Sequence, residues 1–194
     1  MHRFFSAVLF ALWLPLSASA SNAAFSMDQY HHTRWTPENG GPPTIHSMAQ
    51  TPDGWRWFTT VNGLYRFDGV AFEHVPMPAA QLSSRSRMEY LHAHDNGDLY
   101  IAHLGGGLSV RHADGRVEDM MRYPGHPERP VMSLAVDSDG SIWSMTFEAV
   151  HHFTKDRWSA ATIDAGMATG SYRSLLLDRD GRLWLSAARA YAQN

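Results

Sequence analysis

Histidine is the residue type in this sequence that most invites a chemical role. The chain holds 12 histidines and no cysteine, so a metal site would have to use imidazole or carboxylate ligands. Only His92 and His94 share one face of a predicted strand at a spacing that suits two ligands, and no third ligand accompanies them. We therefore interpret the histidines as structural or surface residues, and we predict no metal ion and no other cofactor. The remaining histidines are scattered along the chain: His2, His31, His32, His46, His74, His103, His112, His126, His151 and His152.

The acidic stretch that begins at Asp137 has the start of a calcium-binding loop. Asp137 and Asp139 stand two positions apart, and Glu148 falls at the twelfth position of the pattern. Such a loop needs glycine at its sixth position, where this chain has Ile142. The same acidic pattern recurs at residues 178–181. We therefore interpret both stretches as hairpin turns.

No catalytic motif stands out. The sequence has no nucleophile elbow of the form Gly-x-Ser-x-Gly, and the run Gly105–Gly107 is neither followed by a predicted helix nor joined to the lysine of a phosphate-binding loop. We therefore predict no catalytic residues. An enzyme remains the alternative, because separate parts of a fold can bring carboxylates together at one site. The candidate acids are Glu89, Asp95, Asp98 and Glu148.

The predicted strands and turns that would position any site recur along the chain as a repeat. Four turn signals recur with steps of 43, 43 and 41 residues between their glycines. Asp-Gly and Asn-Gly between apolar runs predict tight hairpins, because glycine adopts the positive φ that such turns need. A hairpin repeated at this period indicates a repeat architecture. The predicted turns are Asp53-Gly54, Asn96-Gly97, Asp139-Gly140 and Asp180-Gly181.

An aromatic residue stands three positions after each turn glycine. Aromatic residues make up only 12% of the chain, so four at one repeat position indicate a shared structural place. They could form a platform for stacking sugars, but recurrence favours packing inside each repeat. The four residues are Trp57, Tyr100, Trp143 and Trp184.

The repeats predict an all-β fold of β-propeller blades. Each unit reads as a four-stranded antiparallel meander, and no segment shows a sustained helical period. In the first strand, alternation places Ile45, Ser47 and Ala49 on one face. Strand spacing alone would also suit a sandwich, whereas the fixed period favours the propeller. The predicted units span 44–80, 87–123, 130–165 and, as a partial blade, 171–194.

About three and a half blades predict an incomplete or open ring, because the smallest propellers have four complete blades. The unpaired ends of such a ring would need cover from the remaining blades of a larger propeller or from a second copy of the chain. Residues 21–43 form an N-terminal segment, and a strand within it around Tyr30 to Trp35 could close the last blade.

The N-terminus reads as a secretory signal peptide over residues 1–20. Phe4 to Leu16 is apolar apart from one serine, and Ala18-Ser19-Ala20 forms a small-x-small cleavage site. The apolar run is shorter than the roughly 20 residues that a spanning helix needs. We therefore expect an exported chain with no membrane span after cleavage. The formal net charge of −3 gives no basic excess, so we predict no nucleic-acid partner.

Several segments resemble the two-component regulator propeller family. They are Trp35 to Gly40, Gln50 to Gly54 and Gly63 to Phe72 in the first unit, with the later turns Asn96 to Tyr100, Asp139 to Trp143 and Asp180 to Trp184. The family comprises periplasmic sensor regions of bacterial signalling proteins that are tethered to the inner membrane.

The resemblance implies a periplasmic, ligand-sensing segment that is not itself an enzyme. In the family, a membrane helix and an output such as a histidine kinase or a diguanylate cyclase follow the propellers, and these parts are absent from this sequence. The implied ligand is an unidentified small molecule or oligosaccharide, and no ligand-contacting residue is predicted. The alternative is a propeller enzyme or glycan-binding protein that acts on an exported polysaccharide.

Overall fold

The computed structural model describes residues 31–78, 87–127, 129–161 and 170–189. All of its strands belong to one compact unit, Trp35–Asn194. The predicted signal peptide, Tyr30 and any third strand of the last blade lie outside the described residues.

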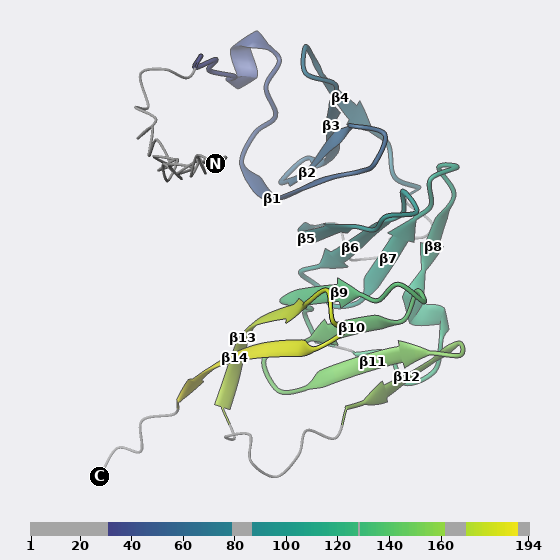
Figure 1. The fold of residues 1–194 in the computed structure, drawn as a ribbon. Coiled ribbons are helices and arrows are strands. Elements are labelled where there is room, and N and C mark those ends of the chain that lie inside the picture. Colours follow the sequence, from purple (N-terminus) through teal and green to yellow (C-terminus); the bar gives the residue numbers. More distant parts are fainter. Residues whose placement is uncertain (1–30, 79–86, 128, 162–169, 190–194) are drawn as a thin grey trace, which may run out of the picture. The chain divides into compact units, whose positions relative to one another are not determined.

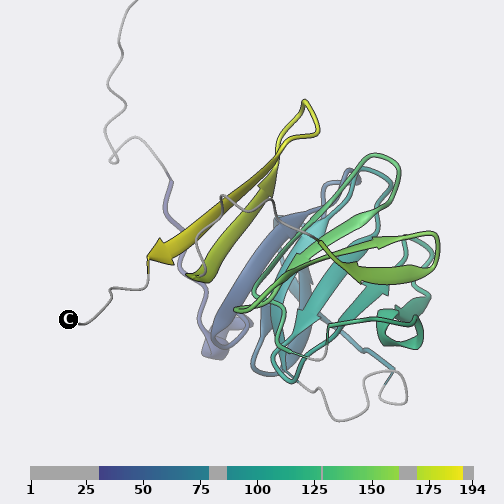
Figure 2. The ribbon, with the colours of Figure 1, turned by 90° about the horizontal axis from the view of Figure 1, so that it is seen from below.

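The strands form four separate antiparallel sheets in chain order (Figures 1 and 2). Three sheets have four strands and the last has two, so the predicted fold class of three complete blades and a partial one is confirmed. The first blade contains β1 (Ile45–Gln50), β2 (Arg56–Thr60), β3 (Gly63–Phe67) and β4 (Phe72–Val75). The second contains β5 (Met88–Ala93), β6 (Leu99–His103), β7 (Leu108–Arg111) and β8 (Val117–Asp119). The third contains β9 (Ser133–Val136), β10 (Ile142–Met145), β11 (Val150–Thr154) and β12 (Arg157–Ala160), and the fourth contains β13 (Gly170–Leu177) and β14 (Leu183–Arg189).

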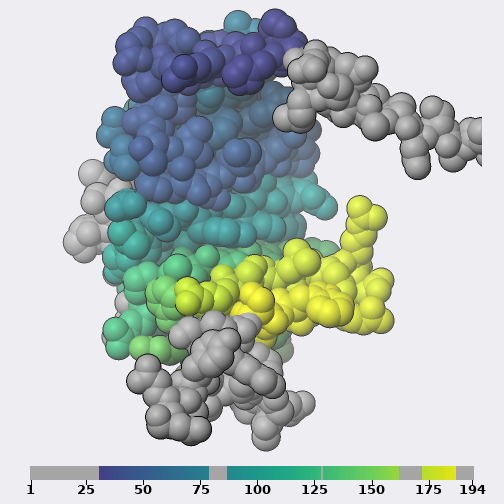
Figure 3. Space-filling model, turned by 90° about the vertical axis from the view of Figure 1, so that its left-hand side faces the viewer, coloured from purple at the N-terminus to yellow at the C-terminus, as the bar shows by residue number. Residues whose placement is uncertain are grey.

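The blades contact one another through their first strands. β1 lies against β5, β5 against β9 and β9 against β13. Figure 3 shows the successive blades side by side in chain order, from blue to yellow. Consecutive turns of the repeat are therefore brought close together, although they are 41 to 43 residues apart in the sequence.

The core is divided among the boundaries between blades. One cluster joins Trp57 and Leu64 of the first blade to Leu91 and Leu99 of the second. Another joins the third blade to Tyr172 and Leu175 of the last. Burial of such side chains, at about 1.5 to 3 kcal/mol each, holds neighbouring blades together.

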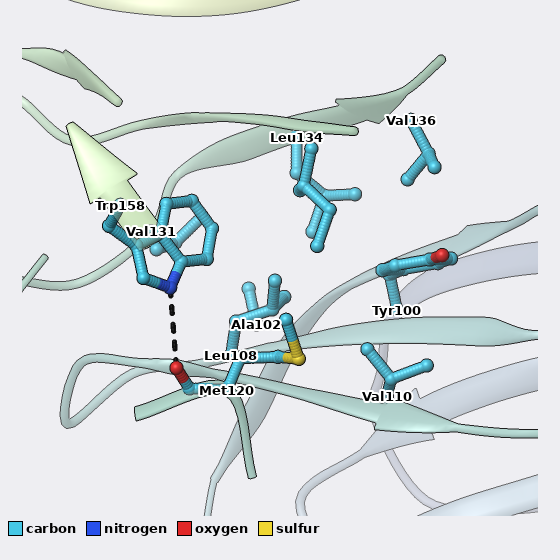
Figure 4. Packing of buried hydrophobic residues seen from close by; sticks show 10 residues of the cluster. Tyr100, Ala102, Leu108, Val110, Met120, Val131, Leu134, Val136 and Trp158 are labelled. Atoms are coloured by element: carbon cyan, nitrogen blue, oxygen red, sulfur yellow. Dashed lines mark hydrogen bonds between the residues drawn. The ribbon is translucent and has the colours of Figure 1, made fainter. Parts of the chain in front are cut away.

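Figure 4 shows the cluster between the second and third blades. Tyr100 and Leu108 of the second blade face Leu134 of the third, and the indole N–H of Trp158 donates to the carbonyl oxygen of Met120 over 3.2 Å. Met120 belongs to a short 3-10 helix, η4 (Met120–Arg122), that follows β8. The segment between the blades therefore contributes to the core as well as to the connection.

A β-bulge corrects the predicted face of Ile45. Ile45 pairs with Thr60 and Ser47 pairs with Thr59, so one extra residue lies between them on β1. Because an extra residue reverses the alternation, Ile45 lies on the opposite face from Ser47 and Ala49. Equivalent register shifts separate Met88 from Tyr90 and Tyr172 from Ser174, so the bulge is itself part of the repeat.

Residues 31–36 form no strand, and a 3-10 turn, η2 (Pro37–Asn39), follows them. The backbone N–H of Thr36 donates to Asn39 Oδ1 over 2.6 Å, and Gly40 ends the turn with φ of 91°. Trp35 then packs edge-on against Phe67 and Phe72 of the first blade. The segment 35–40 is therefore a capped turn anchored by one aromatic ring.

Candidate functional site

The four predicted turns have the same backbone structure. Each turn glycine has a positive φ, and its N–H donates to the carbonyl oxygen three residues earlier over 2.9 to 3.0 Å. The φ values are 91° at Gly54, 89° at Gly97, 83° at Gly140 and 74° at Gly181. These turns form the frame on which any site at this end of the blades must be built.

The acidic or amide residue before the glycine reinforces the turn. Asn96 accepts a hydrogen bond from the N–H of Asp98 over 2.9 Å, and Asp139 accepts one from Ser141 over 2.8 Å. This bond from the Ser141 N–H lowers the pKa of Asp139. Asp53 receives the N–H of Trp55, while Asp180 pairs with the side chain of Arg182. These side chains therefore support their own turns.

The four repeat aromatics share a backbone position but have different partners. The indole N–H of Trp57 donates to Thr51 Oγ1 over 2.9 Å, and that of Trp184 donates to Asp178 Oδ2 over 2.7 Å, which lowers the pKa of Asp178. Trp143 stacks on His152 with 3.9 Å between ring centroids. Burial raises the pKa of Tyr100 to about 12.

Their exposure also differs. Trp57 is 3% exposed and Tyr100 is 6% exposed, Trp143 is half-buried, and Trp184 is 58% exposed. Trp57 therefore has no open face on which a sugar could stack. The packing role assigned to the group stays a prediction.

A cavity of about 260 Å³ lies where the first blade meets the second. Arg66 of β3 and Arg111 of β7 both line it, together with Trp57 of β2. The cavity thus takes cationic side chains from two different blades. Its other lining residues are Thr51, Pro52, Asp53, Asp95, Asn96, Gly97 and Ala113.

The two arginines bracket aromatic rings. The guanidinium carbon of Arg66 lies 4.2 Å from the ring centroid of Trp55, and that of Arg111 lies 4.9 Å from the centroid of Trp57. Such cation–π contacts fix the long side chains in place. Arg66 also forms an ion pair of 2.7 Å with Glu73, an exposed residue of β4.

The two arginines differ in their charged neighbours: Arg66 has an ion pair with Glu73, whereas Arg111 is partly buried beside Arg66. Burial and the neighbouring positive charge of Arg66 lower the pKa of Arg111, while Asp114 and Asp53 act in the opposite direction. The Arg111 guanidinium donates a long hydrogen bond of 3.4 Å to the carbonyl oxygen of His112. An anion between the arginines would relieve their repulsion and accept further hydrogen bonds from them.

Two further cavities lie at the same end of the blades. One, of about 430 Å³, is lined by residues of the turns of the first two blades, from Gln50 to Gly54 and from Ala93 to Asp95. The other, of about 560 Å³, lies between the turns of the last two blades. Asp95 lines all three cavities. The third is lined by four aspartates and one arginine, so it is more acidic than the arginine cavity, where Asp53 and Asp95 match the two arginines in number.

The second blade also contains a polar network that sequence analysis did not predict. His112 contacts Asp98 Oδ2 at 3.0 Å and Glu118 Oε2 at 3.2 Å. Tyr123 donates its hydroxyl to Glu118 Oε1 over 2.7 Å, and this bond, with the contact to His112, lowers the pKa of Glu118. Asp98 precedes β6, His112 follows β7 and Glu118 belongs to β8, so the network ties the ends of these strands to Tyr123 in the connection that follows and has a structural role.

The candidate chemical residues have separate surroundings. Glu89 lies 3.4 Å from Arg87, Glu148 lies 3.6 Å from Arg129, and Asp98 belongs to the network around His112. Within the described ranges no group of three histidine, aspartate or glutamate side chains is arranged to hold a metal ion. Burial, followed by the nearby His94, lowers the pKa of His92. His94 instead contacts the carbonyl oxygen of Asp137 in the third blade at 3.1 Å.

Arg66 and Arg111 were missed by sequence analysis. Both are single charged residues in strands rich in apolar side chains, and they stand at different distances from their turn glycines. A repeat alignment therefore could not pair them. Arg66 of β3 and Arg111 of β7 converge because both guanidinium groups lie over the ring of Trp57.

The blade arrangement is similar to several solved structures. The extracellular domain of BT4673, described as a hybrid two-component system of B. thetaiotaomicron, matches with a TM-score of 0.58 and 21% identity over 74% of this chain and 20% of that one. The extracellular domain of BT3049 from the same organism matches with a TM-score of 0.60 and 18% identity, over 77% and 20%. Virginiamycin B lyase from Staphylococcus aureus matches with a TM-score of 0.60 and 13% identity, over 74% and 48%.

No family model and no curated protein matches the sequence. Among the helices of the described part of the chain, none is long and apolar enough to cross a membrane. The chain spans about a fifth of the length of the two extracellular domains. The resemblance to two-component regulator propellers is confirmed at the level of the fold, which this chain shares with the extracellular domains of two-component systems and with a lyase.

Proposed function

We propose that this chain is a ligand-sensing propeller segment of an exported, two-component-type signal transduction protein. The likeness in fold to two extracellular domains of such systems supports this proposal. The signal peptide read from residues 1–20 supports a periplasmic location, with tethering to the inner membrane in a longer parent protein. Signal output would then belong to other domains of that parent.

The observation that carries the proposal is the cavity shared by the first two blades. Arg66 and Arg111 reach it from different blades and meet at the buried Trp57. A ligand that contacts both arginines would therefore touch both blades at once. Such a ligand changes the balance between two blade packings only if it binds one of them more tightly.

The lining favours a small carboxylate with neighbouring hydroxyl groups, such as a uronic acid. Guanidinium groups bind carboxylates through paired, charge-assisted hydrogen bonds. Asp53 and Asn96, two exposed residues of the lining, can bind sugar hydroxyls, Asp53 as an acceptor and Asn96 as a donor or an acceptor. We accordingly assign the ligand to acidic monosaccharides or to the end unit of an acidic oligosaccharide.

We propose a binding role and no catalytic role for the chain. Three of the four candidate acids are engaged by three different basic side chains. The fourth, Asp95, lines the arginine cavity together with Asp53, whose Oδ1 accepts hydrogen bonds from Thr51 and Trp55 of its own turn. Glycoside hydrolysis needs two carboxyl groups on either side of one bond. The similarity to virginiamycin B lyase concerns the fold alone and does not assign a catalytic acid or base to this cavity.

Isothermal titration calorimetry with galacturonate and with neutral galactose tests the proposal. We expect galacturonate to bind and galactose to bind at least about tenfold more weakly, because loss of a charge-assisted pair costs about 1.5 to 3 kcal/mol. Arg111→Gln should abolish the preference for the acid. Arg129→Gln is the matched control, since Arg129 is exposed and pairs with Glu148 away from the cavity.

Equal binding of the two sugars, or an unchanged preference in the folded Arg111→Gln variant, would contradict the assignment. Circular dichroism of both variants verifies that the fold is kept.

A further inference from the structure

Asparagine followed by glycine occurs three times in the chain, and the three asparagines have different surroundings. The pairs are Asn39-Gly40, Asn62-Gly63 and Asn96-Gly97. In such a pair the backbone nitrogen of glycine can attack the side-chain amide carbon of asparagine, because glycine has no Cβ to block the approach. The structure therefore offers three candidates for the same spontaneous reaction and distinguishes among them.

Two of the three side chains are held by hydrogen bonds within their own turns. Asn39 Oδ1 accepts the backbone N–H of Thr36 over 2.6 Å. Asn96 Oδ1 accepts the N–H of Asp98 over 2.9 Å, and Asn96 Nδ2 donates to Asp98 Oδ2 over 3.2 Å. Each amide must give up these bonds before its carbon can turn toward the following glycine nitrogen. Every bond given up slows the reaction at Asn39 and Asn96.

The third asparagine, Asn62, lies in the loop between β2 and β3. It is exposed, and its side chain makes no hydrogen bond to the described part of the chain. Its backbone N–H donates to Thr60 Oγ1 over 3.1 Å, so the loop is fixed while the amide can rotate. Thr60 and Gly63 form the last pair of the β2–β3 ladder, and the end of a ladder opens more readily than its middle.

His74 of β4 lies against the peptide bond between Asn62 and Gly63. Its Nε2 lies 3.2 Å from the carbonyl oxygen of Asn62, and because a carbonyl only accepts, the imidazole donates here. This oxygen belongs to the same amide as the Gly63 nitrogen, so the bond stabilises the negative charge that forms when that nitrogen loses its proton. A Cβ at residue 63 would stand 3.1 Å from the same Nε2, so glycine leaves room for the ring.

We propose that Asn62-Gly63 is a self-modification site at which His74 assists deamidation. The deprotonated nitrogen of Gly63 attacks Cγ of Asn62 and forms a C–N bond. The side-chain nitrogen then leaves as ammonia, which takes up the proton that Gly63 released. The cyclic succinimide adds one water molecule and opens at either of its two carbonyl carbons, to aspartate or to isoaspartate. Water is the only reactant added, and nothing is oxidised or reduced.

The reaction changes both the charge and the length of the loop. Each product places one new carboxylate next to His74, and isoaspartate also adds a methylene group to the backbone just before β3 (Gly63–Phe67). Asn62, Gly63 and His74 line none of the three cavities described above. The proposal therefore does not depend on the sugar ligand.

Peptide mapping of the full chain tests the proposal, because trypsin places the three pairs in separate peptides. The cleavage sites that separate them are Arg34, Arg56, Arg66, Arg87 and Arg111. The folded chain is kept at mildly alkaline pH, and samples taken over time are digested and read by mass spectrometry. We expect Asn62 to react at least about tenfold faster than Asn96, which must first give up two hydrogen bonds.

The same chain in concentrated urea is the matched control. Without the fold, the three pairs should react at similar rates, since the bonds that distinguish them are gone. Isoaspartate must appear among the products at residue 62, because direct hydrolysis of the side chain gives aspartate alone. Faster reaction at Asn39 or Asn96 in the folded chain, or aspartate as the sole product at residue 62, would overturn the proposal.

Two variants test the part assigned to His74. His74→Ala should slow the reaction at Asn62 about fivefold, the effect of one neutral hydrogen bond, and should leave Asn39 and Asn96 unchanged. His74→Gln should recover part of the rate, because its amide can donate to the same oxygen. In urea all three chains should react alike at Asn62. An unchanged or faster reaction in folded His74→Ala would overturn the assistance, since a side chain that only stiffens the loop would slow the reaction.

Discussion

Trp57 and Trp184 stand at the same place in the repeat, yet one is buried and the other is largely exposed. Both indoles donate to the side chain three residues before the turn glycine, so the hairpins that hold them are alike. The difference arises from what lies beyond the sheet. Residues of the second blade cover Trp57, whereas no described strand covers Trp184. The hairpin is therefore a local property, and burial depends on the neighbouring blade.

The largest expected difference follows from truncating these two tryptophans. Trp57→Ala should lower the free energy of unfolding by about 3 to 5 kcal/mol, because it empties a packed boundary. Trp184→Ala should cost about 1 kcal/mol, mainly for its hydrogen bond to Asp178. Urea denaturation of both variants measures the two losses. Equal losses at the two positions would refute the comparison.

Two glycines separate turn geometry from blade packing. Gly140 has φ of 83°, and a Cβ there would meet open space, so Gly140→Ala should cost only about 1 to 2 kcal/mol for positive φ. Gly125 also has a positive φ, but a Cβ there would collide with the carbonyl oxygen of Trp158. Gly125→Ala should therefore cost about 1 to 3 kcal/mol more. Thermal or urea unfolding of both variants measures the two losses of stability. A smaller loss for Gly125→Ala than for Gly140→Ala would contradict this prediction.

The two serines give a smaller contrast of the same kind. Ser133→Ala should cost about 1 kcal/mol, because Ser133 is buried and bonds the next blade. Ser174→Ala should leave the unfolding midpoint unchanged, since Ser174 is exposed. A matching loss of stability in both serine variants would contradict the assignment of their positions.

Acid should weaken the network of the second blade. The pKa of Glu118 is lowered in the folded chain, mainly by the Tyr123 hydroxyl. Its contribution to stability is therefore present above the unfolded pKa of about 4.3 and is lost as the pH falls through the lower folded value. Glu118→Gln should flatten this part of the acid limb in a series of urea midpoints. An unchanged acid limb in that variant would rule Glu118 out as a contributor.

The sequence predicted the features that depend on local chemistry. The positive φ of the turn glycines, the four-stranded units and the half blade at the end all follow from short-range patterns that recur. The bulge on β1 was missed because no residue type marks it, and it placed Ile45 on the other face. Alternation alone cannot reveal one extra residue within a strand.

The arginine cavity could not be predicted for a different reason. Arg66 and Arg111 meet across a blade boundary, and their sequence separation carries no information about that distance. The predicted open ring implied uncovered end blades, but it did not identify Met48 and Trp184, because their repeat positions are the same as those of buried residues. Both features belong to the assembly of blades and not to any single blade.

Hydroxyl-radical footprinting read by mass spectrometry tests most directly whether burial at one repeat position depends on the neighbouring blade. Met48 and Trp184 should be oxidised rapidly while Trp57 and Tyr100 are protected, in line with their exposure. Equal oxidation of Trp57 and Trp184 would contradict the account.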